Sequence, residues 1–204
     1  MDSWRRSRVG ILGTLSEFHL QPIDYDLECL RRLVVDLAPD LLCAEITRDV
    51  WERGDLSQAA LEVREALAPV VALTDTVLVP VAASWERFED LVPAEGWRRK
   101  AVAIFDRALR QAQRAANRPQ AVNSALFENI CHTVCALTEL AWTPRERALW
   151  DAQNAVMAEN ICQAVRNDPG RRVLVAVQCQ RVHKLEPLLK RQRKILELVN
   201  YWEL

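Results

Sequence analysis

The stretch Val173-Leu174-Val175-Ala176-Val177 (VLVAV) decides the fold class, because it is an uninterrupted run of apolar residues. Polar residues bound it on both sides, with Arg171-Arg172 before it and Gln178 after it. A strand covered on one face alternates apolar and polar residues, whereas a continuous apolar run is typical of a strand buried on both faces. Such strands occur mainly in parallel sheets. The run therefore predicts a parallel strand inside an α/β protein.

Three earlier segments have the same character and predict three more strands: Arg8 to Thr14 (RVGILGT), Leu41 to Ile46 (LLCAEI) and Val77 to Ala82 (VLVPVA). The last of these contains Pro80, which lacks the backbone N–H that a central strand would donate. We therefore expect Val77 to Ala82 near an edge of the sheet and the other strands in its centre.

Amphipathic segments between these runs predict helices. The clearest start is Thr143-Pro144-Arg145-Glu146, a capping box with proline at the first helical position. The predicted helices run from a cap at Asp24 to about Leu37, from Ser57, from Trp97 to about Asn117, from Ser124 to Ala141, from Thr143 to Asn167, and from about Lys184 to Leu198. This order predicts a single α/β domain over 1–204, with a mostly parallel central sheet of at least four strands flanked by helices. The helices of 97–167 form an insertion before the last strand.

The composition of the 204-residue chain excludes several classes of function. Its 27 Lys+Arg and 28 Asp+Glu leave a net charge of -1, so the chain has no bulk attraction for nucleic acid or for an anionic membrane. Its 5 glycines cannot form a Walker A loop or a GxGxxG fingerprint. None of its 6 cysteines forms a CxxC pair, and no signal peptide or transmembrane run is visible. We therefore expect a cytoplasmic protein with reduced thiols.

Polar side chains follow three of the predicted strands. They are Glu17, His19, Glu45, Cys179, Arg181 and His183. Because the carboxyl ends of parallel strands meet at one edge of a sheet, we expect these side chains around one cleft. Each of them alone is also compatible with a solvated loop residue or a helix cap. Glu45 is the sharpest signal, since a carboxylate that closes a buried run needs a partner or access to solvent.

The chemistry of these side chains predicts a role for each. Glu17, His19, Glu45 and Arg181 are the candidate catalytic residues, with a carboxylate or imidazole as general base and the guanidinium holding an anionic group. A divalent metal ion would be bound by Glu45, His19 and His183. His183 and Cys179 are the candidate cofactor-binding residues, with haem as the alternative to a metal ion.

Short motifs, in order along the chain, resemble those of one superfamily. The first strand ends in Ile11-Leu12-Gly13-Thr14-Leu15-Ser16-Glu17, and a helix then leads to Ala38-Pro39-Asp40-Leu41-Leu42-Cys43-Ala44-Glu45. The late helix carries Asn154-Ala155-Val156-Met157-Ala158-Glu159-Asn160-Ile161, and the basic-flanked strand Arg171 to Val177 follows it. The chain thus resembles a divergent member of the superfamily of TraB-like, erythromycin-esterase-like and haem-binding ChaN-like proteins.

The resemblance implies four functional positions: a histidine after the first strand, a glutamate after the second, an arginine in the late helix and a Gly-x-x-His after the last strand. Glu45 matches the glutamate, and Glu17 matches an acidic residue beside the first motif. The chain departs from the pattern at Ser16 (first histidine), Gln153 (arginine), Gln178 (glycine) and Arg181 (final histidine).

The activity that the resemblance implies is metal-assisted hydrolysis of a small molecule. The departures leave two alternatives. One is a catalytically degenerate scaffold that binds haem or a metabolite, with His19, His183 or a cysteine as an axial ligand. The other is a protein-interaction subunit. The expected partner is a small molecule, not nucleic acid or a membrane, and a homo-oligomer is compatible with the sequence.

Overall fold

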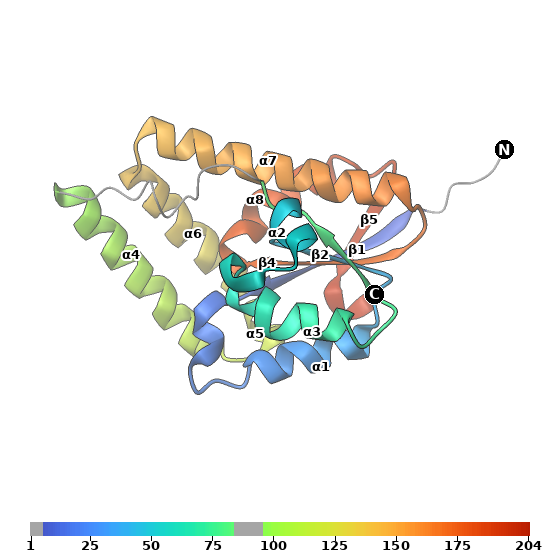
Figure 1. Ribbon diagram of the computed structural model, residues 1–204. Coiled ribbons are helices and arrows are strands. Elements are labelled where there is room, and N and C mark those ends of the chain that lie inside the picture. The colour runs from blue at the N-terminus through green and yellow to red at the C-terminus, as the bar shows by residue number, and fades with distance from the viewer. Residues whose placement is uncertain (1–5, 84–95) are drawn as a thin grey trace.

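The computed structural model describes residues 6–83 and 96–204 and shows an α/β protein built on a five-stranded sheet (Figure 1). The strands are β1 (Ser7–Thr14), β2 (Leu41–Ala44), β3 (Val77–Pro80), β4 (Arg172–Gln178) and β5 (Leu196–Asn200). Their order is β3-β2-β4-β1-β5, and all four pairings are parallel. This confirms the predicted fold class, with one strand beyond the minimum of four. That the chain forms a single domain stays a prediction.

β4 is the central strand, as its apolar run predicts. It pairs with β1 from Arg8↔Arg172 to Thr14↔Gln178 and with β2 from Leu41↔Val173 to Ala44↔Ala176. Val173 to Val177 are all buried. β3 lies at one edge and pairs with β2 alone among the described strands, so the position of Pro80 at an edge is confirmed.

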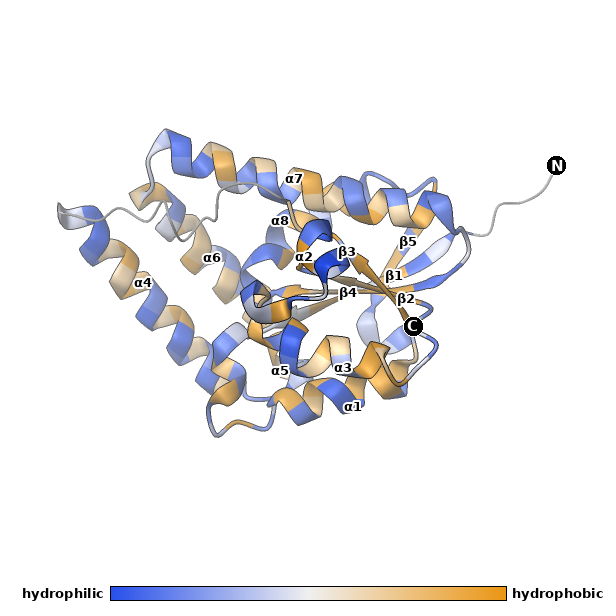
Figure 2. Ribbon diagram, in the orientation of Figure 1, coloured by the Kyte–Doolittle hydropathy of each residue, from blue (hydrophilic) through white to orange (hydrophobic). Residues whose placement is uncertain are grey.

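Helices cover both faces of the sheet, because every central strand has apolar side chains on both sides. On one face Leu12, Leu174 and Ala176 pack with α1 (Leu27–Leu37) and the segment that ends in α3 (Ala68–Val71). On the other face Val173, Val175 and Val177 pack with α7 (Pro144–Asn167) and α8 (Cys179–Lys190). Figure 2 shows β2, β3 and most of β4 in hydrophobic colours, and the helices around them in alternating colours. The sheet is thus the middle of three layers.

The inserted helices lie between β3 and β4 in the chain. They are α4 (Gly96–Ala115), α5 (Pro119–Val122), α6 (Ala125–Ala141) and α7. α4 and α6 lie beyond the end of the sheet in Figure 1, and they pack against each other. The capping box of α7 is confirmed, with the Thr143 hydroxyl accepting from the Glu146 N–H. The face of α7 that points into the protein carries Trp150, Met157 and Ile161, all of which are buried.

The prediction for the end of the chain is wrong in part. The segment from Lys184 to Leu198 is not one helix: α8 already begins at Cys179 and ends at Lys190, and Leu196–Asn200 forms β5 beside β1. Leu196, Leu198 and Val199 make a short apolar strand, whose pairing with β1 outweighs the helical spacing. The helical insertion consequently precedes β4, which is not the last strand.

Two helix starts also differ from the prediction. Asp26, not Asp24, caps α1, and its carboxylate accepts from the N–H of Cys29 at 2.7 Å. Ser57 lies in a 3₁₀ turn, Leu56–Gln58, that Asp55 caps, and the helix follows at Leu61. In the first case Asp26 is the N-cap acceptor, and in the second the cap of Asp55 closes a short 3₁₀ turn before the helix begins. This second helix contains a π-helical stretch, Val63–Leu67, and continues into α3.

Among the described helices, none combines the length and apolar content that a bilayer-spanning segment needs.

Candidate functional site

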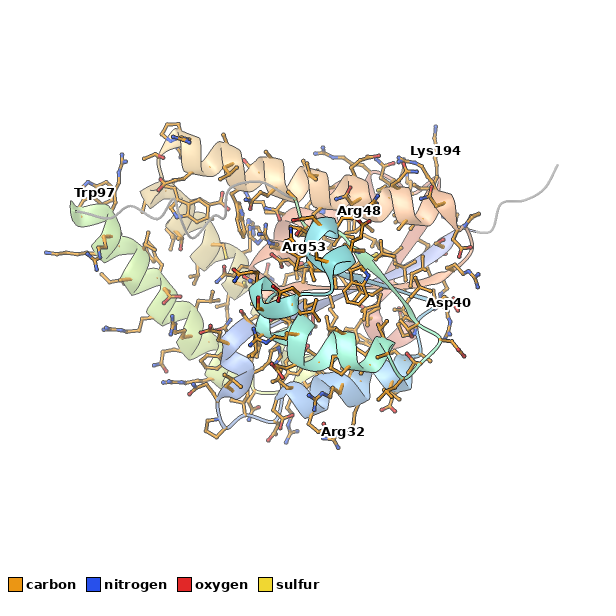
Figure 3. The ribbon with its side chains drawn as sticks, viewed as in Figure 1. Arg32, Asp40, Arg48, Arg53, Trp97 and Lys194 are labelled. Atoms are coloured by element: carbon orange, nitrogen blue, oxygen red, sulfur yellow. The ribbon has the colours of Figure 1, made fainter. Side chains whose placement is uncertain are left out.

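The carboxyl ends of β1, β2 and β4 meet at a polar groove of about 780 Å³, which we call the strand-end groove. The turn after β1, the loop after β2 with α2 (Arg48–Arg53), the segment 57–64, and α7 and α8 all contribute to its wall. Arg53 lies at the end of α2 beside it (Figure 3). This is the edge of the sheet at which ligands bind in open α/β proteins.

Glu45 and Arg181 form an ion pair in this groove. Glu45 follows β2 directly, and its Oε1 accepts from Arg181 Nε at 2.5 Å, while its Oε2 accepts from the N–H of Gln178 at 3.2 Å. Both side chains are only 11% exposed. A carboxylate at the end of a buried strand needs a partner, and the structure provides a guanidinium and a backbone donor.

Arg181 has several partners within the protein besides Glu45, and its predicted role in holding an anionic group of a substrate stays a prediction. Its two terminal nitrogens donate to Asn154 Oδ1 at 3.3 Å and Gln153 Oε1 at 3.4 Å. Its guanidinium also lies 4.2 Å from the ring centre of Trp150. All three partners come from α7, so Arg181 fixes Glu45 against that helix.

His19 is buried, and its ring links two backbone segments through a hydrogen bond at each nitrogen. Its Nδ1 lies 2.7 Å from the carbonyl oxygen of Tyr25, and its Nε2 accepts from the N–H of Leu15 at 2.9 Å. These partners require the neutral ring with its proton on Nδ1. Burial lowers the pKa of His19, against the opposing effect of the hydrogen bond to Tyr25. Both nitrogens are therefore used by the backbone.

Cys179 and His183 lie away from the strand-end groove. They belong to α8 rather than to a loop, and in a helix residues two apart point about 200° apart. Arg181 consequently faces α7, while the ring of His183 stacks on His132 of α6 at 5.2 Å between ring centres. Cys179 begins α8 and contacts Gln113 and Cys131. The structure thus separates the residues that follow β4.

Glu17 lines the strand-end groove together with Ser16. Ser16 has a φ of 52°, in the left-handed region that residues other than glycine seldom adopt. Backbone strain of this kind is concentrated at ligand-binding sites. Of the six predicted site residues, Glu17, Glu45 and Arg181 lie around one groove, whereas His19, Cys179 and His183 are absent from its wall.

Glu62 was missed by sequence reasoning. Its Oε1 accepts from the hydroxyl of Thr14, the last residue of β1, at 2.8 Å. Burial raises the pKa of Glu62 to about 7, and the charge of Glu45 acts in the same direction. The signal in the sequence is a carboxylate inside the apolar run Ala59-Ala60-Leu61-Glu62-Val63. The side chain of Glu62 is buried and does not line the strand-end groove.

The described side chains do not fit the predicted metal site or a haem. Of the three predicted metal ligands, only Glu45 lines the strand-end groove, since His19 has a backbone partner at each nitrogen and His183 faces α6. Over residues 6–83 and 96–204, no group of three His, Cys, Asp or Glu side chains is placed to hold a metal ion. The cavity beside Cys179 and His183 measures about 110 Å³, far below the volume that a macrocycle occupies.

Comparison with protein-family models, with curated proteins and with solved structures found no match.

Proposed function

We propose that the chain binds a small polar molecule in the strand-end groove, with Glu45 as the central hydrogen-bond acceptor. The Glu45–Arg181 ion pair is the observation that carries this proposal. It lies largely buried in the wall of a groove large enough for a metabolite, at the edge of the sheet where α/β proteins bind ligands. A carboxylate held in one orientation by a guanidinium and a backbone N–H is ready to accept from a ligand.

The groove indicates what kind of ligand it accepts. Glu45 suits a hydroxyl, amine or amide N–H, and the amides of Gln153 and Gln178 add donors and acceptors at the same edge. Arg53 and Arg64 also line the groove and suit an anionic group. A metabolite with hydroxyl or amino groups and one anionic group matches this set.

The resemblance to TraB-like proteins is part of the proposal. The five residues that stand at its four functional positions all line the strand-end groove: Ser16, Glu45, Gln153, and Gln178 with Arg181 at the last position. These positions are far apart in the sequence, so their convergence supports a shared layout.

We favour ligand binding over metal-assisted hydrolysis, because His19 and His183 do not reach the groove. Hydrolysis with Glu45 as general base is the second candidate. The observation that favours it is the nearby Glu62, whose pKa is raised to about 7 while Glu45 is ion-paired. Two carboxyl groups in such different environments are typical of acid–base sites. The cytoplasmic location and a homo-oligomer stay predictions.

Thermal-shift measurements with a panel of amino acids, sugar phosphates and nucleosides would test the binding proposal. A ligand that stabilises the chain should lose at least about tenfold in affinity for Glu45→Gln, measured by calorimetry at a temperature where that variant is folded. Arg64→Ala should weaken an anionic ligand. Arg110→Ala is its control, since it also removes a surface arginine paired with an acid but lies outside the groove.

Equal affinity of the Arg64→Ala and Arg110→Ala variants would remove the anion-binding role. Equal affinity of Glu45→Gln and the unchanged chain would overturn the central role of Glu45. If the chain hydrolyses the stabilising ligand, chromatography would detect the loss of that ligand and the appearance of its hydrolysis products.

A further inference from the structure

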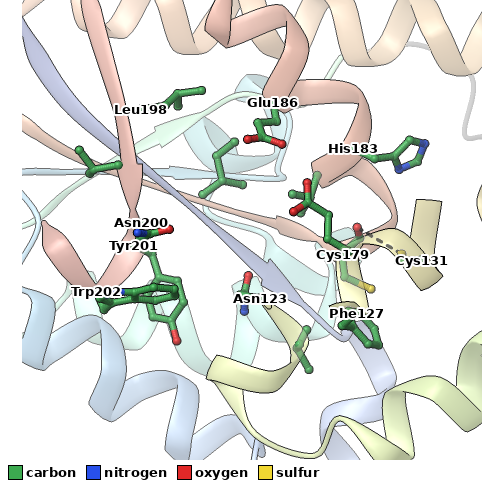
Figure 4. Close-up of a pocket in the computed structure, with 15 residues that line it drawn as sticks. Asn123, Phe127, Cys131, Cys179, His183, Glu186, Leu198, Asn200, Tyr201 and Trp202 are labelled. Atoms are coloured by element: carbon green, nitrogen blue, oxygen red, sulfur yellow. Dashed lines mark hydrogen bonds between the residues drawn. The ribbon is translucent and has the colours of Figure 1, made fainter. Parts of the chain in front are cut away.

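A second cavity, of about 110 Å³, lies between α6, α8 and the end of β5, outside the strand-end groove (Figure 4). We call it the thiol pocket. Its wall contains two sulfur atoms and two carboxyl groups, those of Cys131, Cys179, Glu128 and Glu186. None of these residues takes part in the proposed function, so the chemistry of this pocket is a separate question.

Cys131 contacts Cys179 through both its backbone and its side chain, and each thiol has a further hydrogen-bond partner. Cys131 Sγ lies 3.6 Å from the carbonyl oxygen of Cys179 and 4.0 Å from Cys135 Sγ. The buried side chain of Gln113 donates from Nε2 to Cys179 Sγ at 3.5 Å. Cys179 is also the first residue of the twelve-residue helix α8, where free N–H groups favour negative charge.

The two thiols differ in acidity because of these contacts. The hydrogen bond with Cys131 lowers the pKa of Cys179, and the amide of Gln113 and the N–H of Gln180 add to that effect against burial. Hydrogen bonds with Cys135 and Cys179 raise the pKa of Cys131. Of the two thiols, Cys179 is therefore the one that loses its proton more readily.

A proton donor lines the same pocket. Burial and a hydrogen bond with Glu186 raise the pKa of Glu128 to about 7. Like charges so close cannot both ionise easily, so the two carboxyl groups share a proton near neutral pH. The pocket thus combines a nucleophilic sulfur, a second thiol beside it and an acid.

We propose that Cys179 and Cys131 form a peroxide-reactive dithiol, with hydrogen peroxide as the oxidant. The Cys179 thiolate attacks one peroxide oxygen, so that an S–O bond forms and the O–O bond breaks. The leaving hydroxide takes the shared proton of Glu128 and Glu186 and departs as water. Cys131 then attacks the Cys179 sulfenic acid, so that the S–S bond forms, the S–O bond breaks and a second water leaves. Two thiols are oxidised to a disulfide, and one peroxide is reduced to two waters.

The dimensions of the pocket select the oxidant. A volume of about 110 Å³ holds hydrogen peroxide but not an aromatic hydroperoxide or glutathione. Cumene hydroperoxide should therefore react with Cys179 far more slowly than hydrogen peroxide does. This selectivity separates the thiol pocket from an exposed cysteine, which would accept both oxidants.

The experiment compares cysteines within the unchanged, reduced chain. It is treated with one equivalent of hydrogen peroxide for increasing times, unfolded in N-ethylmaleimide and mapped by peptide mass spectrometry. Cys179 should react at least about tenfold faster than Cys29, which is more exposed but whose pKa is raised, chiefly by burial. A linked peptide pair containing Cys131 and Cys179 should accumulate, while Cys43 and Cys162 stay alkylatable.

Three matched variants assign the roles. Cys131→Ser should trap the sulfenic acid on Cys179, detected with dimedone, and Cys179→Ser should abolish fast oxidation. Cys135→Ser, one helical turn from Cys131, should behave like the unchanged chain. The proposal is overturned if Cys29 reacts first, if the disulfide joins Cys131 to Cys135, or if both hydroperoxides react equally. The unchanged chain decides all three outcomes when the mapping is repeated with cumene hydroperoxide, so the test needs no variant to fold.

Discussion

Glu45 Oε1 and Arg181 Nε lie 2.5 Å apart, and they join the end of β2 to α8 across the carboxyl edge of the sheet. The sequence separation of 136 residues makes this contact one that only the folded chain can form. Since the same pair lies in the groove wall, its contribution to stability and its contribution to binding must be separated by experiment.

Breaking the pair from one side should be strongly destabilising. Glu45→Gln leaves a buried guanidinium without its counter-charge, which costs about 3–5 kcal/mol of unfolding free energy. The double variant Glu45→Gln/Arg181→Met should recover a large part of this loss. Denaturant titration of the unchanged chain, the two single variants and the double variant measures the coupling free energy between the two side chains. If the losses in unfolding free energy of the single variants simply add in the double variant, the two charges do not depend on each other.

Glu62 should make the chain more stable in mild acid. Its pKa of about 7 in the folded state lies above the ordinary 4.5, so the unfolded chain releases its proton first as the pH rises. Stability should therefore fall between pH 4.5 and 7, by on the order of 3 kcal/mol. Glu62→Gln keeps an oxygen for the Thr14 hydroxyl and should remove this slope. An unchanged slope in urea titrations from pH 4.5 to 8 would contradict the assignment.

His19 should have the opposite pH dependence. Burial lowers the pKa of His19 from its ordinary value of 6.5. As the pH falls below 6.5, the imidazole is therefore protonated in the unfolded chain before it is protonated in the folded chain. The contribution of the neutral ring to stability is complete above pH 6.5 and decreases as the pH falls toward the lowered pKa. His19→Ala should remove this slope and cost about 1–3 kcal/mol at pH 8, because a buried N–H and a buried carbonyl lose their partner. Chemical denaturation at several pH values would measure both effects.

Met157 tests the packing of α7. It is 1% exposed and lies in the core between α7 and the sheet. Met157→Ala should cost about 2–5 kcal/mol, from the loss of buried surface and the cavity that remains. Asp151→Ala is the control, since it lies on the exposed side of the same helix and should change stability little. Equal effects of both substitutions would contradict the observed orientation of α7.

The strands that form the centre of the sheet could be predicted because their burial on both faces leaves a continuous apolar run, as in Val173 to Val177. β5 could not be recognised in the same way, since Glu197 and Asn200 interrupt its apolar residues. β5 is placed by its pairing with Ser7 to Ile11 of β1. This contact joins distant parts of the chain, so the local sequence of β5 does not indicate it.

The candidate site was predicted in part for a similar reason. Glu45 was identifiable, because a carboxylate at the end of a buried run is a local signal. Arg181 and His183 were expected to converge, but they point in different directions because α8 begins immediately after β4. The use of both His19 nitrogens by Leu15 and Tyr25 follows from a 3₁₀ turn, Ser16–Leu20, whose geometry local spacing does not show.

The position of β1 between β4 and β5 has a consequence for biosynthesis. Among the five strands β1 is made first, yet both of its neighbours, β4 and β5, are made last. β2 likewise pairs on one side with β4, so the nascent chain carries apolar strands with open edges until β4 has been made. Contacts between such distant segments form slowly and leave intermediates prone to aggregation. Truncation before β4 should consequently leave β1 without either of its neighbours and β2 with β3 as its only partner among the described strands.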